Sequence, residues 1–520
     1  MRILVPAAIL AAAHVGRVGA GPVPPRGRVV SYPDHIPVKA GEFIVEFHDD
    51  AADSPARRLR GMPSVSVDHY YDSPFVGMAV TVGGSVSPSH LAGIAGVKRV
   101  FPNRVHMLSY LPGDQNLTST YLHEATGVQR AREELGLDGK GVKIGIIDTG
   151  VDYMHPELGA CWKTPGCPWQ YGQDFVGDNF SFYDPNPVIK PNPTPVDCVG
   201  HGTHVSGILA AQGPLVQGVA PGATFGMYRV FACPDQRGSI PTTDAIVVKA
   251  MEAAYKDGHD IITMSLGAGG WAESPMSACA ASLAARGVVV VAGNGNQGVN
   301  GLITSNAPAV GDGVIAVGSV DNWSFTGITI VITTLQDRFD MPTQPSSQSN
   351  SPFVFAGDTP IVAAKDSNGD TNVCSPVAAS LAGRIALIPT GNCTYAQKAM
   401  LAQQAGAVGV LLYNAEGEAM VGVAVPKNVT IPVALVTYED GVRIAKAIAL
   451  GPATVSTPNN NATTVAYPLG GKMSLFSSFG PTPELGLSPA ISAPGGNIWS
   501  TYPRTKGSYI SMSGTSMATP

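Results

Sequence analysis

Three short motifs place an aspartate, a histidine and a serine where side chains of these types could act together. Asp148 lies in IIDTGVD (146–152), directly after a run of apolar residues. His201 lies between glycines in GHGTHVSG (200–207), and Ser516 lies in GTSMATP (514–520). A serine hydroxyl is a poor nucleophile at neutral pH unless a base takes its proton, and histidine titrates near that pH. A buried carboxylate can fix the imidazole tautomer and stabilise its charged form, so the three residues together predict nucleophilic catalysis by an Asp-His-Ser triad.

Each motif has a simpler interpretation when it is taken alone. Asp148 could cap a turn, and Ser516 could be the N-cap of a helix. His204 follows His201 by three positions, so the pair could belong to a zinc site, although the sequence lacks the glutamate of an HExxH pattern and an obvious third ligand. The occurrence of all three motifs in one chain is what favours catalysis.

The elements that must position these residues follow an α/β pattern. Strands without polar alternation are predicted at 142–147, 224–231, 261–265, 288–292 and 314–320, and helices at 201–211, 244–256 and 275–286. Buried strands that alternate with helices indicate a mostly parallel sheet with helices on both faces. Ligands and catalytic groups gather at the carboxyl ends of such strands, and Asp148 follows the first of them.

The chain resembles the subtilisin-like serine proteases (subtilases), whose signature is these three motifs in the order Asp, His, Ser. Further segments match the family, namely GVAP (218–221), MSLG (264–267), SFGP (478–481) and ISAPGG (491–496). The resemblance covers most of residues 140–322 and 474–520. It implies a subtilisin-like α/β fold and an endopeptidase that works through an acyl-enzyme intermediate, with Asp148, His201 and Ser516 as its catalytic triad.

The resemblance also assigns residues to substrate and oxyanion binding. Ser265, Leu266 and Gly267 fall where the family's cleft strand pairs with an extended peptide. The family's oxyanion donor is an asparagine in a Gly-Asn-x-Gly turn, and AGNGNQG (292–298) offers two candidates. Asn296 fits the full pattern whereas Asn294 lacks the closing glycine, so we favour Asn296 over Asn294.

The N-terminal residues have the pattern of an exported precursor. A basic start followed by an apolar stretch predicts that residues 1–20 are a signal peptide and that the protein is secreted. Residues 21–115 are expected to comprise a Pro- and Gly-rich spacer and a compact α/β unit. This unit has the position of the family's propeptide, which implies an intramolecular inhibitor that is cut off near Tyr110–Thr120.

The pattern changes between residues 323 and 473, where short β-type runs predominate with one amphipathic helix at 395–405. LAGRIALI (381–388) and AGAVGVL (405–411) resemble protease-associated (PA) domains. Residues 323–473 are therefore expected to be a β-rich PA-like domain inserted between two parts of the catalytic domain, 116–322 and 474–520. In subtilases such domains influence substrate access, and an inert spacer is the alternative.

Seven cysteines and six N-x-Ser/Thr sequons suit a secreted glycoprotein. Cys161 with Cys167 and Cys374 with Cys393 are candidates for local disulfides. Cys198 could be a disulfide partner, or it could be the unpaired cysteine that lies beneath the histidine in proteinase K-like subtilases. The sequons are at Asn116, Asn179, Asn322, Asn392, Asn428 and Asn461.

The charge and hydropathy of the chain exclude some classes of partner. A formal net charge of −6 over 520 residues does not favour nucleic acid or an anionic membrane. No segment after the N-terminus reaches the ~18 apolar residues that span a bilayer. The expected partners are protein or peptide substrates and the chain's own propeptide. No cofactor or metal is predicted, and the structural calcium that the resemblance allows has no ligands assigned in this sequence.

The sequence stops at Pro520, four residues after Ser516, where subtilases continue into a long buried helix. Without that helix, Ser516 is expected to lie at a fraying end beside exposed apolar surface, and the 520-residue chain is expected to have little peptidase activity. The alternative function is therefore a catalytically inactive secreted glycoprotein that binds peptides. Robust casein hydrolysis by the purified chain would contradict the expected loss of activity.

Overall fold

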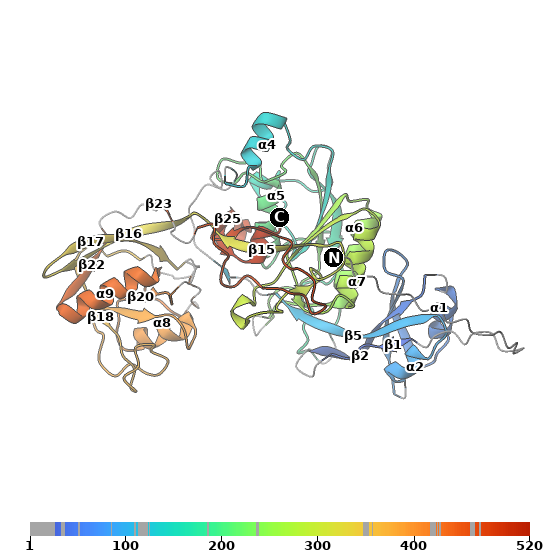
Figure 1. The fold of residues 1–520 in the computed structure, drawn as a ribbon, viewed down its shortest axis with the longest axis horizontal. Helices are drawn as coiled ribbons and strands as arrows, with labels where there is room; N and C mark the ends of the chain where they lie inside the picture. The colour runs from blue at the N-terminus through green and yellow to red at the C-terminus, as the bar shows by residue number, and fades with distance from the viewer. Residues whose placement is uncertain are drawn as a thin grey trace, which may run out of the picture.

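The fold is that of a computed structural model, in which three lobes lie side by side (Figure 1). The structure describes residues 27–32, 37–49, 52–84, 86–108, 111–112, 123, 125–184, 187–235, 239–346, 353–355, 357–416, 423, 425, 428–457, 463–466 and 470–520. The predicted signal peptide, most of the predicted spacer and most of the predicted cleavage region near Tyr110–Thr120 lie outside the described residues.

Seven parallel strands form the sheet of the central lobe, in the order β24-β15-β13-β11-β7-β9-β8. Their bounds are β7 (Lys143–Asp148), β8 (Trp169–Asp174), β9 (Thr224–Arg229), β11 (Ile261–Met264), β13 (Val289–Gly293), β15 (Ile315–Asp321) and β24 (Ile491–Gly496). Every strand predicted in this region is present, and the parallel arrangement agrees with the predicted fold class.

Helices cover both faces of this sheet because neighbouring strand residues point to opposite sides. Ile147 of β7 belongs to the apolar core that β7 shares with α6 (Asp244–Lys256) and α7 (Pro275–Ala285). Its neighbour Ile146 belongs to the core on the other side, which contains α5 (His201–Ala210) and α10 (Thr515–Ala518). Both isoleucines are fully buried, and each such side chain contributes roughly 1.5–3 kcal/mol to stability.

The N-terminal lobe is a sheet in the order β1-β5-β2-β4-β3 with two helices. Its elements are β1 (Arg28–Val29), β2 (Val38–Phe47), α1 (Asp53–Arg60), β3 (Val65–Tyr71), β4 (Gly77–Val82), α2 (Pro88–Ala92) and β5 (Val97–Met107). The end of β5 leaves this lobe and pairs antiparallel with β10 (Pro241–Thr243) of the central lobe. β5 thus reaches from the N-terminal lobe toward the central lobe (Figure 1), and β10 is the sixth strand of its sheet.

Apolar packing also joins these two lobes. Tyr71, Phe75 and Phe101 of the N-terminal lobe are buried in the same core cluster as α6 and α7. The Tyr71 hydroxyl donates a hydrogen bond to the carbonyl of Ala245, 3.2 Å away. The N-terminal lobe is thus held by strand pairing at one end and by side-chain burial along α6 and α7.

The third lobe is a β-rich insertion between β15 and β24. Its strands are β16 (Ser324–Thr334), β17 (Arg338–Pro345), β18 (Thr359–Ala363), β19 (Ile385–Pro389), β20 (Gly409–Tyr413), β21 (Val433–Val436), β22 (Ala453–Ser456) and β23 (Thr463–Ala466). The sheet order β17-β21-β20-β19-β18-β22-β16 closes on itself because β16 also pairs with β17. Closure satisfies strand edges that would otherwise be open to pairing with other chains.

The described residues of the insertion include two helices, so the prediction of a single helix is wrong. The predicted helix is α8 (Tyr395–Gln404), and the unpredicted one is α9 (Tyr438–Leu450). Thr437 caps α9 by accepting a hydrogen bond from the Asp440 N–H. A glycine at position 441 lowers the helix propensity of this segment, whereas packing of Ile444 into the core of the insertion stabilises it.

The central lobe also contains shorter elements, three of which lie close to the site or the ends of the main sheet. One is the ribbon of β12 (Ala268–Gly269) and β14 (Asn306–Ala307), and another is helix α4 (Val128–Leu135). The third is the antiparallel sheet of β25 (Ile498–Thr501), β26 (Tyr509–Ser513) and β6 (Leu111–Pro112). Among the described residues, no helix combines the length and apolar character needed to cross a bilayer.

Three disulfides are present. Cys161–Cys167 and Cys374–Cys393 are the two candidate local pairs. Cys198 pairs with Cys233, so of the two alternatives for Cys198 the structure has the disulfide. The remaining cysteine, Cys279, is a buried thiol on α7.

The sequons differ in accessibility. The side chains of Asn179, Asn392 and Asn428 are exposed and could accept a glycan. Asn322 is buried and its Nδ2 donates to the Asn497 carbonyl, so the folded protein cannot carry a glycan there. Asn116 and Asn461 lie outside the described residues.

Gly172 offers a test of the central sheet. It has a φ of +100°, and an added Cβ would lie 1.9 Å from the Met227 carbonyl oxygen on β9. Gly172→Ala is expected to lower the free energy of unfolding by about 3 kcal/mol or more, because the rigid neighbouring strand would have to move. Urea denaturation measures the change. Gly287→Ala is the matched control, since Gly287 has a φ of +89° but open space around its Cβ position, and only about 1–2 kcal/mol of backbone strain is expected. Equal losses in the two variants would contradict the packing shown here.

Candidate active site

The core of the site is a contact between a buried carboxylate and a buried imidazole. Asp148 is the last residue of β7 and His201 is the first residue of α5, and both side chains are fully buried. His201 Nδ1 lies 2.8 Å from Asp148 Oδ1. The Thr149 N–H also donates to Asp148 Oδ1, at 2.7 Å. The end of a strand and the start of a helix, 53 residues apart in sequence, thus meet at the carboxyl edge of the sheet, where catalytic groups gather.

Close backbone packing explains the glycine that follows His201. An added Cβ on Gly202 would lie 2.1 Å from the carbonyl oxygen of Gly150. The Gly202 N–H donates to Thr149 Oγ1 at 2.7 Å. The absence of a side chain at position 202 therefore lets α5 approach the turn after β7 closely enough for His201 to reach Asp148.

A second buried aspartate, Asp197, fixes the segment that leads into α5. Its carboxylate accepts five hydrogen bonds, which come from the backbone N–H groups of Val199, Gly200 and Thr203 and from the hydroxyls of Thr203 and Thr149. Burial raises the pKa of Asp197, and these hydrogen bonds oppose that effect. Asp197 was not among the residues predicted from the sequence. The available signal was an acidic residue just before the glycine-flanked histidine, where free backbone N–H groups at a helix start need an acceptor.

Ser516 lies on α10, which packs against α5. Its side chain is buried and hydrogen-bonded, so the structure does not show the fraying end on which the expected loss of activity depended. The Ser516 hydroxyl donates to the Ser265 carbonyl at 3.0 Å, and the Ser265 hydroxyl donates back to the Ser516 carbonyl at 2.7 Å. Ser265 directly follows β11. This reciprocal pair fixes the serine next to the segment that was predicted to bind substrate.

The two candidate asparagines occupy different environments. Asn294 is fully buried, and its side chain is bonded to the Ser478 carbonyl and the Ser488 hydroxyl. Asn296 is only partly buried, and its Oδ1 accepts from both the N–H and the hydroxyl of Thr515 at 2.9 and 3.0 Å. Because Thr515 holds the oxygen, the Nδ2 of Asn296 is the group that can donate beside Ser516. The polar atoms of the Asn294 side chain are instead used in hydrogen bonds within the core.

A cleft brings these groups together. Its lining includes Ser265, Leu266 and Gly267 together with Asn296 and Ser516. Residues 106–108 at the end of β5 also line this cleft. The predicted substrate-binding, oxyanion and nucleophile positions thus share one cavity, and a strand of the N-terminal lobe runs along it.

The zinc interpretation of His201 and His204 has no support in the geometry. His204 Nε2 lies 2.9 and 3.1 Å from the carbonyl oxygens of Ile498 and Ile510. Burial and the neighbouring His201 lower the pKa of His204 to about 3, so its imidazole is neutral and can donate its Nε2 proton to these carbonyls. His204 is therefore a neutral histidine of the core, held by its Nε2, while its buried Nδ1 has no hydrogen-bond partner among the described residues.

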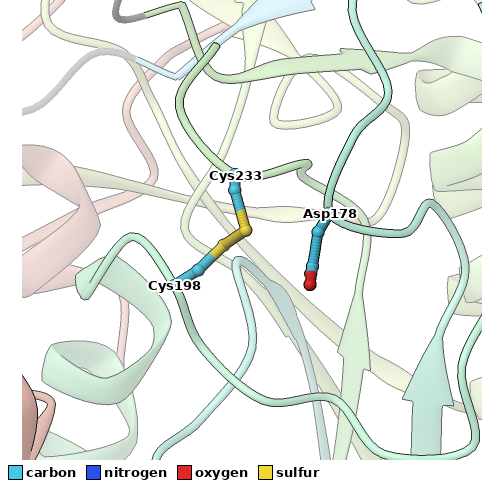
Figure 2. Close-up of side chains that lie close together, drawn as sticks. All are labelled: Asp178, Cys198 and Cys233. Carbon is cyan, nitrogen blue, oxygen red and sulfur yellow. A yellow bond between two sulfur atoms is a disulfide. The ribbon is translucent and has the colours of Figure 1, made fainter.

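Within the part of the chain that the structure describes, one group of potential metal-binding side chains lies close together, and it comprises Asp178, Cys198 and Cys233 (Figure 2). Figure 2 shows that the two sulfurs are joined to each other, so neither is a thiolate ligand. The Arg229 guanidinium donates to Asp178 Oδ1 at 2.7 Å and approaches both sulfurs. This cation already neutralises the carboxylate, and the group is not a metal site.

The Asp197 network gives a prediction about stability. Asp197→Asn is expected to lower the free energy of unfolding by about 3 kcal/mol, because an amide oxygen cannot accept from all five donors and its NH₂ group would face them. Thermal or urea unfolding measures the loss. Asp178→Asn is the control, since that side chain is 66% exposed and should cost less than about 1 kcal/mol. A similar small loss in both variants would show that Asp197 does not anchor the α5 loop.

Comparisons with known proteins identify the family of this chain. The profile of the Subtilase family matches residues 139–520. The minor extracellular protease Vpr of Bacillus subtilis (strain 168) is 32% identical over 492 residues, covering 89% of this chain and 56% of Vpr. The PII-type proteinase of Lacticaseibacillus paracasei is 28% identical over 481 residues, covering 83% of this chain and 24% of that protein. The chain thus spans about half, or a quarter, of the length of these relatives.

Among solved structures, the psychrophilic subtilisin-like protease Apa1 of Pseudoalteromonas sp. AS-11 is 20% identical, with a TM-score of 0.39 and coverage of 77% of this chain and 84% of Apa1. The family match extends over most of the chain and includes every element that carries the site. The protein belongs to the subtilase family of serine proteases.

Proposed function

We propose that this chain is a secreted serine endopeptidase in which Asp148, His201 and Ser516 act as a catalytic triad. The observation that carries the proposal is the buried contact between Asp148 Oδ1 and His201 Nδ1, beside the helix that presents Ser516. This contact keeps the proton on Nδ1, so Nε2 is the ring nitrogen available as a base.

The reaction follows from these positions. His201 Nε2 takes the proton of Ser516 Oγ as the hydroxyl gives up its bond to the Ser265 carbonyl and attacks the peptide carbonyl carbon. The Asn296 amide donates to the negative oxygen that forms. His201 then returns the proton to the leaving amine, which gives an acyl-enzyme, and water attacks this ester by the same route in reverse. Asp148 stabilises the charged imidazole in both steps without taking a proton itself.

Substrates would bind as extended strands. β5 already demonstrates such pairing, since residues 105–107 lie antiparallel to β10 at one side of the cleft. β6 pairs with β26, the strand that leads directly to Ser516. Backbone pairing of this kind accepts many sequences and supports a protein or peptide substrate.

The same contacts support the proposal that residues 21–115 include an inhibitory propeptide. The end of β5 lies along the cleft that a substrate would need, since residues 106–108 are part of its lining. The closed β-rich insertion between β15 and β24 supports the proposal of a PA-like domain at 323–473. Secretion is supported by the apolar N-terminus, the three disulfides, the exposed sequons and a relative named as an extracellular protease.

A fluorophosphonate probe tests the proposed nucleophile. We expect the probe to label the full chain and the label to map to Ser516, because only an activated serine reacts with it. The Ser516→Ala variant should not be labelled, whereas Ser511→Ala, which changes a serine five residues earlier, should retain the label. A folded chain that is not labelled at Ser516 would contradict the proposal and favour the peptide-binding glycoprotein instead.

Asn296→Ala tests the oxyanion donor. We expect kcat for a peptide substrate to fall roughly 10²–10³-fold with little change in KM, the size of the loss when one such donor is removed from subtilisin. Asn300→Ala, an exposed change in the same loop, should leave kcat within about twofold. A kcat for Asn296→Ala equal to that of the control would remove Asn296 from the mechanism.

A further inference from the structure

A carboxylate that the proposed mechanism does not use lies at the start of α6, next to the cleft. Asp244 is the first residue of α6 and is fully buried. Two side chains from the end of β5 reach it. Arg104 binds it with two nitrogens, Nε to Oδ2 at 2.8 Å and Nη2 to Oδ1 at 3.2 Å, and His106 Nε2 lies 2.7 Å from Oδ1.

Arg104 and His106 have the spacing of residues that lie on the same face of a strand. Arg104 and His106 are two positions apart, so on an extended chain both point to the same side. His106 is the partner of Thr242 in the register between β5 and β10, and both residues line the cleft that contains Ser516. Asp244 follows Thr243, the last residue of β10. The carboxylate therefore lies two residues beyond Thr242, beside the strand along which an extended peptide would run toward Ser516.

The negative charge of Asp244 is buried next to the positive charge of Arg104. Burial alone would raise the pKa of Asp244, but Arg104 and His106 lower it to about 2, so the carboxylate is ionised. A buried ion is costly without a partner of opposite charge. The central lobe also supplies a second acceptor, since Arg104 Nη1 donates to the Gly269 carbonyl at 2.9 Å. The Arg104 guanidinium also lies over the ring of Tyr32, which belongs to the N-terminal lobe, 4.9 Å from the ring centroid.

We propose that Asp244 is a specificity-determining residue of the cleft, which selects peptides with a basic side chain at the position that pairs with Thr242 and a second basic side chain two residues earlier. This inference rests on the proposed protease function. The preferred substrates are extended peptides with the pattern basic-x-basic, and the chain's own Arg104-Val105-His106 is an example of it. A neutral or acidic residue at these positions leaves the buried carboxylate without a partner.

Matched peptides test the inference. Quenched fluorescent peptides with the sequence of residues 103–112 are compared with versions carrying Ala or Glu in place of Arg104 and His106. We expect kcat/KM for the parent peptide to exceed that for the alanine version by tenfold or more, since truncating one partner of a buried charge pair typically has at least this effect. The Asp244→Asn variant should reduce the ratio to within about threefold. Occupancy of the cleft by the chain's own strand lowers every rate by the same factor, so the ratios remain comparable.

Glu252→Gln is the matched control. Glu252 is a second buried carboxylate on α6, and it contacts His69 and the Asp72 N–H of the N-terminal lobe rather than the cleft. Its loss should leave the peptide ratio unchanged. Equal rates for the parent and alanine peptides in a chain that hydrolyses both would overturn the inference while leaving the protease function intact, as would an equal change in ratio in the Asp244→Asn and Glu252→Gln variants.

A chain that hydrolyses no peptide and is not labelled by fluorophosphonate would instead overturn the protease function. Hydrogen exchange in the Ser516→Ala chain then decides whether Asp244 recognises basic side chains. Faster exchange of the Thr242 and Thr243 amides with His106→Ala than with the control His69→Ala would support recognition at the cleft. Equal protection in these two variants would overturn it.

Discussion

The contact between the Asp148 carboxylate and the His201 imidazole constrains everything around the cleft. Both groups are removed from water, and losing either one leaves the other buried without its partner. The contact requires the end of β7 and the start of α5 to lie within hydrogen-bonding distance. Thr149 and Asp197 bridge the two segments, so the turn after β7 and the loop before α5 form one hydrogen-bonded unit. The Cys198–Cys233 disulfide ties that loop to the segment after β9, on the neighbouring strand.

Local sequence patterns predict the central lobe well because its strands and helices are long and strongly apolar. The helix predicted at 244–256 has the bounds of α6, and each predicted strand of the parallel sheet lies within two residues of its observed ends. The match to the subtilase family confirms this fold class. The sequence also placed Asp148 at a strand end and His201 at a helix start, and the structure brings the two into contact. The motifs could not predict the hydrogen bond of Ser516, whose hydroxyl donates to the Ser265 carbonyl.

The features that sequence reasoning missed depend on contacts between distant residues. In the sequence, Asp197 cannot be told from any other loop aspartate, because only the fold brings its five hydrogen-bond donors to it. Pairing of β5 with β10 joins segments about 140 residues apart, and no local pattern specifies that register. The helix α9 contains a glycine and is stabilised mainly by packing, so its propensity alone is a poor guide. The partner of Cys198 was undetermined for the same reason, because disulfide connectivity follows the fold.

The N-terminal lobe is attached by strand pairing, by polar contacts with Asp244 and Glu252 and by apolar burial, and this has a consequence for any cut in the chain after β5. Strand pairing with β10 depends on a few backbone hydrogen bonds, whereas Tyr71, Phe75 and Phe101 are buried against the central lobe. Breaking one peptide bond removes none of this apolar contact. The two fragments would therefore remain together as a non-covalent complex, and their separation would be a second, slower event with its own activation barrier. Electrophoresis under denaturing conditions would then show two separate fragments, whereas gel filtration of the same sample would show one particle of the uncut size.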